Sequence, residues 1–208
     1  MINSANPQNY PKVEPAYRLF IALHVPESIR AAIHDAQESL RVALRPGAVR
    51  WTPASQFHLT LRFLGDVAIE RVEELCRSIE GACAGFGELE LMAGQVGCFP
   101  NLRRPRVVWV GVHDATNRLL ALHLAIEAGA REFSTERPET KFTGHITLGR
   151  VKELSRIDAR VLAAGIAVMA DRRFGVWQGG AVELIRSKLS AAGAEYSLVG
   201  SFPLSRGD

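Results

Sequence analysis

The chain has 208 residues, of which 47% are hydrophobic, 23% are charged and 7% are aromatic. This balance is typical of a globular protein and excludes the disordered, collagen-like and coiled-coil classes. The formal net charge of +3 is compatible with an anionic substrate but too small to demand a nucleic-acid partner. At this length about 70% of the unfolded surface can be buried, so the core needs neither a disulfide nor a metal.

The three cysteines, Cys76, Cys83 and Cys98, lack Cys-x-x-Cys spacing and lie in apolar stretches. This favours reduced core residues over a disulfide framework or a zinc site. No apolar run approaches the length of a membrane span, and residues 1–15 are rich in Asn and Pro without the apolar segment of a signal peptide. We therefore expect a cytoplasmic protein with no membrane partner and a flexible tail over residues 1–15.

In chain order, the first half is predicted to form a strand, a helix, a strand, a helix and two strands, over residues 17–24, 26–45, 49–64, 68–84, 89–92 and 106–113. Pro26 suits a helix start, and Pro46-Gly47 ends that helix. A Gly/Pro-rich loop through Gly94, Gly97 and Pro100 is expected to join the last two strands.

The second half repeats the plan. A helix, a loop, a strand and a shorter helix are predicted over residues 116–133, 136–139, 142–151 and 154–164, and strands near 168 and over 182–189 and 196–204 complete the sheets. No composition break separates the halves. The pattern indicates an α+β protein in which two similar lobes of sheet with outer helices pack together as a single domain over residues 16–208.

Two segments carry the same four-residue pattern: His58-Leu-Thr60-Leu and His145-Ile-Thr147-Leu. Side chains alternate between the two faces of a strand, so each His and its Thr project on one surface while the aliphatic residues enter the core. A lone histidine on a strand is more often structural than catalytic. A duplicated pattern within a duplicated arrangement of elements indicates a functional pair.

Two His-Thr pairs that face each other suit displacement at phosphorus. Near pH 7 one imidazole can accept a proton while the other donates one. The threonine hydroxyls can donate hydrogen bonds to anionic oxygens. No pattern typical of metal ligands accompanies the pair, so we expect a mechanism without metal or cofactor.

The chain resembles the two-histidine (2H) phosphoesterases, and among them the RNA 2′,3′-cyclic phosphodiesterases, also known as bacterial 2′-5′ RNA ligases. The resemblance extends over residues 18–204. The matching segments are Arg18-Leu-Phe-Ile-Ala-Leu, Pro26-Glu-Ser-Ile-Arg, Val49-Arg-Trp, residues 57–65, Gly97-Cys-Phe-Pro100, residues 105–111, residues 142–150, Ser187 and Gly193-Ala-Glu-Tyr196. One departure is Gly144, which stands where the family usually has proline before the second histidine.

The resemblance implies a bilobal, pseudo-symmetric fold of mostly antiparallel sheet around a central cleft. It also implies hydrolysis of RNA 2′,3′-cyclic phosphate ends to 2′-phosphomonoesters, with 2′-5′ ligation as the reverse reaction. By family convention His58 is the proton donor to the leaving 3′-oxygen and His145 is the acceptor from water. Thr60 and Thr147 hold the phosphate oxygens.

Four more residues are candidates for substrate contact. Arg62 shares the strand parity of His58 and can reach an anionic ligand, although a solvated or ion-paired arginine fits equally well. Arg150 has the opposite parity to His145, so it reaches the cleft only if a bulge or the strand end turns it. Phe20 and Tyr196 are candidates for stacking on a nucleobase, with core packing as the alternative.

The preferred interpretation is a monomeric, metal-independent phosphodiesterase that acts on RNA with a 2′,3′-cyclic phosphate terminus. One alternative is a phosphodiesterase for another small 2′,3′-cyclic or 2′-5′ nucleotide. The other alternative is an RNA-end-binding module without turnover. Such a module would be expected to lose a His or a Thr of the motifs, and all four are present.

Overall fold

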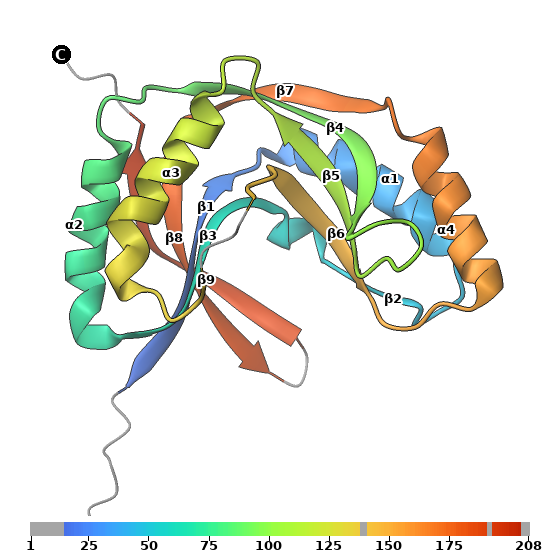
Figure 1. The fold of residues 1–208 in the computed structure, drawn as a ribbon, viewed down its shortest axis with the longest axis horizontal. Coiled ribbons are helices and arrows are strands. Elements are labelled where there is room, and N and C mark those ends of the chain that lie inside the picture. The colour runs from blue at the N-terminus through green and yellow to red at the C-terminus, as the bar shows by residue number, and fades with distance from the viewer. Residues whose placement is uncertain (1–14, 138–140, 191–192, 205–208) are drawn as a thin grey trace, which may run out of the picture.

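The computed structural model describes residues 15–137, 141–190 and 193–204. Within these residues, nine strands form one curved sheet flanked by four α-helices (Figure 1). Residues 1–14 of the tail predicted over residues 1–15, and part of the loop predicted over 136–139, lie outside the described residues. None of the helices described is both long and apolar enough to cross a membrane.

All strand pairs in the sheet are antiparallel, in the order β7-β4-β5-β6-β3-β1-β8-β9, and β2 pairs with β6. The strands are β1 (Ala16–His24), β2 (Val49–Trp51), β3 (His58–Ala68), β4 (Leu89–Phe99), β5 (Val107–His113), β6 (His145–Val151), β7 (Arg173–Gly179), β8 (Ala181–Ser190) and β9 (Gly193–Pro203). The helices are α1 (Glu27–Ala43), α2 (Val72–Cys83), α3 (Arg118–Ala130) and α4 (Arg156–Val168).

The sheet divides into two lobes at its centre, because β3 and β6 are joined only through the pair Leu59–Ile146 among the described residues. One lobe contains β3, β1, β8 and β9, and the other contains β6, β5, β4 and β7. Leu59 and Ile146 are both fully buried, so the junction is part of the core. The predicted α+β fold with two lobes is confirmed.

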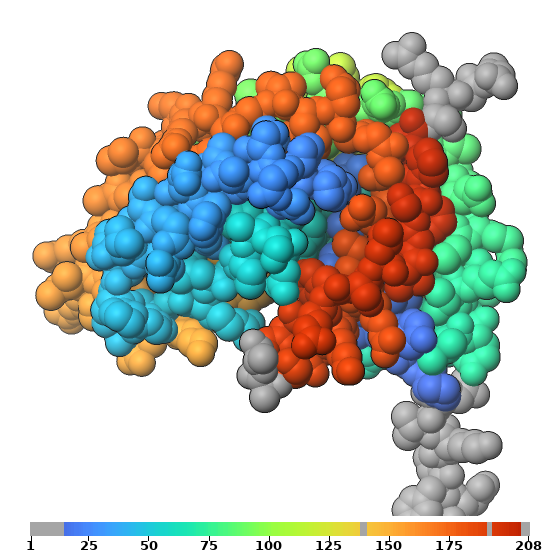
Figure 2. Space-filling model, turned by 180° about the vertical axis from the view of Figure 1, so that it is seen from behind, coloured from blue at the N-terminus to red at the C-terminus, as the bar shows by residue number. Residues whose placement is uncertain are grey.

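The chain places two helices on the lobe opposite to the strand that precedes each of them. After β1 it forms α1, which packs on α4 and β7 of the other lobe, and it then returns to form β3. After β5 it forms α3, which packs on α2 and β3, and it then returns to form β6. Helix α1 thus lies over the lobe of β6, and α3 lies over the lobe of β3 (Figure 1). Figure 2 shows the face that carries α1.

Three predicted elements differ in the structure. Gly94 and Gly97 lie inside the long strand β4 instead of a loop. A Cβ atom on Gly97 would lie 2.3 Å from the ring of Trp109, so this glycine permits a close approach across the strands. Val168 ends α4 and is not a strand residue, and β7 was not predicted. Residues 49–64 form two strands instead of one, separated by a short 3₁₀ turn over Ala54–Gln56.

One buried polar side chain connects α1 to the centre of the sheet. The amide of Gln37 on α1 is 2% exposed and donates to the carbonyl oxygens of Thr52 at 2.7 Å and Leu148 at 2.8 Å. A carbonyl that loses its donor in a buried position keeps most of its desolvation cost. Gln37 therefore stabilises the packing of α1 against β6.

We expect Gln37→Leu to lower the free energy of unfolding by about 1–3 kcal/mol, because it removes the side-chain hydrogen bonds to the carbonyls of Thr52 and Leu148, of which the Leu148 carbonyl keeps the Thr52 amide as a donor. Urea unfolding followed by circular dichroism measures the change. The matched control is Gln178→Leu at an exposed position of β7, where a change within about 0.5 kcal/mol is expected. Equal effects of the two substitutions would show that the Gln37 bonds do not hold α1 in place.

Candidate active site

The two His-Thr motifs lie on the innermost strands of the two lobes. Since β3 and β6 are antiparallel and paired at Leu59–Ile146, one step along each strand brings His58 toward Thr147 and Thr60 toward His145. All four side chains line one cleft of about 700 Å³. The structure therefore brings together the four residues that the sequence motifs predict.

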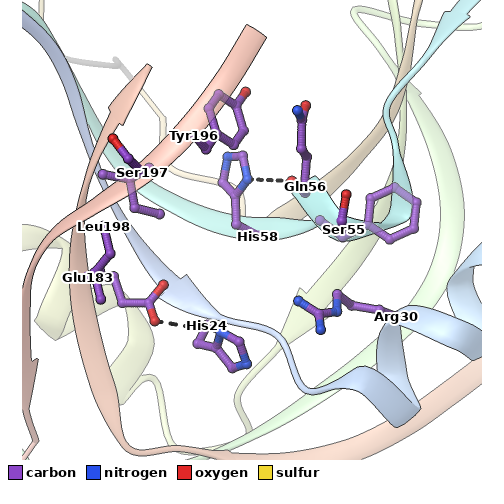
Figure 3. A pocket seen from close by; sticks show the side chains of 11 residues that line it. His24, Arg30, Ser55, Gln56, His58, Glu183, Tyr196, Ser197 and Leu198 are labelled. Atoms are coloured by element: carbon purple, nitrogen blue, oxygen red, sulfur yellow. Dashed lines mark hydrogen bonds and ion pairs between the residues drawn. The ribbon is translucent and has the colours of Figure 1, made fainter. Parts of the chain in front are cut away.

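Both histidines are held in the same way. The Nδ1 atom of His58 lies 2.7 Å from the carbonyl oxygen of Gln56, and the Nδ1 atom of His145 lies 2.8 Å from that of Thr143 (Figure 3 shows His58). A carbonyl only accepts, so each Nδ1 carries a proton and donates it. The Nε2 atom of each ring is left for the cleft, where it can accept or donate a proton.

Gly144 does not loosen the second histidine. Its carbonyl accepts a hydrogen bond of 2.9 Å from the backbone of Val112 on β5. A Cβ atom at position 144 would lie 2.8 Å from the Val112 oxygen. The backbone just before His145 is therefore packed tightly against β5, and the absence of a side chain at Gly144 permits this contact.

The surroundings of the two histidines differ. His58 packs against Phe20 at 4.7 Å between ring centroids and meets Tyr196 edge-on at 5.5 Å. Burial lowers the pKa of His58 to about 4. The hydrogen bond to the Gln56 carbonyl opposes this shift, and the charge of His145 adds to it. His145 contacts one aromatic ring, the edge-on Phe99 at 5.0 Å. Before substrate binds, His58 is thus neutral near pH 7.

A β-bulge follows the threonine in both motifs. In β3, Leu61 has no partner on β1, and in β6, Leu148 has no partner on β5. Each bulge reverses the side-chain parity of the residues beyond it. As a result Arg150 lines the cleft, and in the other lobe Phe63 does the same. The expectation that a bulge would turn Arg150 into the cleft matches this placement.

Arg62 is a correction. The bulge turns it away from the cleft, and it is 5% exposed. Its Nε atom lies 3.2 Å from a Glu127 carboxylate oxygen, and its terminal nitrogens donate to Ser134 Oγ and to the carbonyls of Glu136 and Arg137. Arg62 holds the segment after α3 against β3, as the ion-paired alternative expects, and it lines a second pocket beside Thr60 and His145.

The two aromatic candidates are placed differently. Phe20 is 2% exposed and lies behind His58, so it packs against the imidazole and is closed to a nucleobase. Tyr196 is 38% exposed and lines the cleft beside His58. Burial raises the pKa of its hydroxyl, and the positive charges of Arg150 and Arg50 oppose that rise.

Sequence reasoning missed several residues of the cleft. The residues concerned are Thr52, Gln56, Phe63, Phe99, Lys141 and Thr143. Phe99 was placed in a loop, and Phe63 changes face only because of the bulge. Gln56 and Thr143, whose carbonyls bind the two histidines, could have been found from the sequence, because each lies two residues before its histidine. Among the described residues, no three His, Cys, Asp or Glu side chains form a potential metal site.

Comparison with known proteins gives a consistent result. Residues 23–109 match the family model described as LigT-like phosphoesterase. The chain is 31% identical over 181 residues to a protein of Methanothermobacter thermautotrophicus named RNA 2′,3′-cyclic phosphodiesterase, covering 86% of this chain and 95% of the relative. A Thermus thermophilus protein of the same name is 30% identical, with 90% of each chain covered.

Solved structures show the same fold. A crystal structure from Thermus thermophilus superposes with a TM-score of 0.73 at 28% identity and covers 92% of this chain and 99% of that one. E. coli LigT in complex with 3′-AMP gives 0.71 at 24% identity, again with 92% and 99% covered.

A curved antiparallel sheet that carries two His-x-Thr strands on one cleft defines a two-histidine phosphoesterase. The chain belongs to the family of LigT-like phosphoesterases, several of whose curated members are named RNA 2′,3′-cyclic phosphodiesterase. The family predicted from the sequence is confirmed.

The structural role of Arg62 predicts that Arg62→Met lowers the free energy of unfolding by about 3 kcal/mol or more, because Glu127 is left as a buried charge without its partner. Urea unfolding measures the loss. Adding Glu127→Leu is expected to recover part of it, because the unpaired charge is then removed. A stable Arg62→Met protein with a raised KM would instead return Arg62 to the substrate site.

The low pKa of His58 predicts that anion binding is coupled to proton uptake. A phosphate within about 4–6 Å favours the imidazolium and raises the pKa of a histidine. In the folded protein alone His58 is protonated only as the pH falls toward 4, so inorganic phosphate should move its titration to higher pH. Titration of the His58 Cε1–H resonance with and without phosphate measures this, and His58→Gln assigns the signal. An unchanged midpoint in saturating phosphate would contradict the coupling.

Proposed function

We propose that this protein hydrolyses RNA 2′,3′-cyclic phosphate ends to 2′-phosphomonoesters by acid-base catalysis between His58 and His145. The observation that carries the proposal is the matched anchoring of the two rings. Each Nδ1 atom donates to a backbone carbonyl, so two Nε2 atoms face one cleft together with two threonine hydroxyls. The names of the curated relatives support RNA as the substrate class.

The proposed reaction assigns one role to each ring. His145 Nε2 accepts a proton from water as the water oxygen forms a bond to phosphorus. The bond between phosphorus and the 3′-oxygen breaks, and His58 Nε2 donates its proton to that oxygen. Thr60 and Thr147 donate hydrogen bonds to the non-bridging oxygens, where negative charge accumulates. The product keeps its phosphate on the 2′-oxygen, and each ring ends in the other's initial protonation state.

The donor role of His58 depends on the substrate. With its pKa at about 4, about one molecule in a thousand carries the proton on His58 at pH 7. The bound phosphate raises that fraction, because the imidazolium then faces an anion. Substrate binding therefore creates the acid that the reaction needs. The reverse reaction follows when a 5′-hydroxyl takes the place of water and the product is a 2′-5′ bond.

Two narrower statements stay predictions, namely the monomeric state and the cytoplasmic location.

The activity assay also distinguishes two alternative functions. Turnover of small cyclic nucleotides without activity on RNA would indicate another 2′,3′-cyclic or 2′-5′ substrate. Tight RNA-end binding with no turnover would indicate a binding module.

We expect purified protein to convert an RNA oligonucleotide ending in a 2′,3′-cyclic phosphate into the 2′-phosphate product, and to do so in excess EDTA. His58→Gln and His145→Gln should each lower kcat about 10²–10⁴-fold, as loss of a general acid or base does. Thr60→Val and Thr147→Val should have smaller effects, because each removes one hydrogen bond. Chromatography that separates 2′- from 3′-phosphate ends provides the readout.

Circular dichroism and thermal unfolding serve as the folding control for these variants. The pH dependence of residual kcat/KM assigns the two roles. Without the base His145 the acidic limb should disappear, and without the acid His58 the basic limb should disappear. The opposite pairing would exchange donor and acceptor, and near-normal turnover in both variants would refute two-histidine catalysis.

A further inference from the structure

Two arginines face each other across neighbouring strands at one end of the cleft. Arg50 on β2 is the direct cross-strand partner of Arg150 on β6. Both side chains are exposed, and residues directly opposite in an antiparallel pair project to the same face. Since Arg150 lines the cleft, Arg50 extends the same cationic surface outward from it.

The arrangement has a cost that nothing nearby offsets. Like charges placed directly opposite each other destabilise a sheet. Among the ion pairs of the described residues, none includes Arg50 or Arg150. Both charges act on the Tyr196 hydroxyl beside His58, so the two guanidinium groups lie near the His58 end of the cleft. Two unpaired guanidiniums at the rim of an active site are suited to an anion.

We propose that Arg50 and Arg150 together bind a backbone phosphate of the RNA on the 5′ side of the terminal nucleotide, so that the protein favours oligonucleotides over cyclic mononucleotides. This inference rests on the proposed function. Arg50 contributes to binding of the chain and not to the chemical step.

The direction of the strand follows from the roles of the histidines. His58 donates to the 3′-oxygen of the terminal ribose, so that ribose lies on the His58 side of the phosphorus, and water attacks from the His145 side. The RNA continues from the same ribose through its 5′-oxygen. Along β6, Arg150 lies beyond Thr147, on the side of His58. The next phosphate therefore leaves the cleft over Arg150 and Arg50.

The position on β3 that corresponds to Arg150 on β6 carries no charge. After its bulge, β3 presents Phe63 where β6 presents Arg150. Phe63 is 46% exposed and carries no charge, so it offers no site for a phosphate. The asymmetry between Phe63 and Arg150 gives the cleft one cationic exit, and Arg50 lengthens that exit.

The test compares Arg50→Met with Arg160→Met, which removes the same charge from an exposed position of α4. Each protein is assayed with a 2′,3′-cyclic mononucleotide that has a free 5′-hydroxyl and with a trinucleotide that ends in the same cyclic phosphate. In Arg50→Met the ratio of kcat/KM for the trinucleotide to that for the mononucleotide should fall about tenfold or more, as expected for a lost charged hydrogen bond. Arg160→Met should keep the wild-type ratio.

Binding separates this proposal from the proposed function. A fluorescent RNA ending in a 3′-phosphate is titrated at several KCl concentrations and followed by anisotropy. Loss of one phosphate contact should reduce the slope of log K against log salt by about 0.7 in Arg50→Met. If the wild-type protein turns over neither substrate, the proposed function fails, while the anisotropy still tests the arginine pair.

Two results would overturn the inference: an unchanged substrate ratio in Arg50→Met, or affinity and salt slope equal to those of Arg160→Met. Thermal unfolding excludes a folding artefact. Because Arg50 and Arg150 repel each other, Arg50→Met should unfold at a temperature no lower than that of the wild-type protein.

Discussion

The contact on which the site depends is the single strand pair between Leu59 and Ile146. Both side chains are fully buried, so the junction is fixed by the core and not by the cleft. Because strands alternate their faces, burying these two residues forces the histidine and threonine on either side of each to the opposite face. A register slip of one residue would bury the imidazoles and expose the aliphatic side chains. The core therefore specifies the active-site geometry.

The two halves share a backbone plan but not an environment. In both, a carbonyl two residues earlier holds Nδ1 of the histidine, and a bulge follows the threonine. The side chains around that plan differ. Phe20 and Tyr196 surround His58 and exclude water from it, whereas Phe99 alone contacts the His145 ring edge-on. Since desolvation disfavours the imidazolium, the aromatic surroundings of His58 lower the pKa of that ring.

Much of this could be predicted from the sequence because the signals are periodic. The two motifs, the two lobes and the helices follow from alternation and from helical spacing. The errors have a common physical origin in irregular backbone. Parity arguments failed for Arg62 because a single unpaired residue, Leu61, reverses the faces beyond it. Glycines that predicted a loop instead permit β4 to approach Trp109. Arg50 lies in a segment that matches the family, but its place beside the cleft becomes visible only through its strand partner Arg150.

The electrostatics of the cleft become balanced only when a phosphate is present. Burial lowers the pKa of His58, and the positive charges of Arg150 and Arg50 both act on the Tyr196 hydroxyl beside it. His58 is therefore not protonated near pH 7 before binding, because burial lowers its pKa. An incoming phosphodiester changes the sign of the local field, which raises the proton affinity of His58 and relieves the repulsion between the arginines. In the proposed mechanism, substrate charge therefore prepares the catalyst, and a neutral molecule of similar shape lacks the charge to do so.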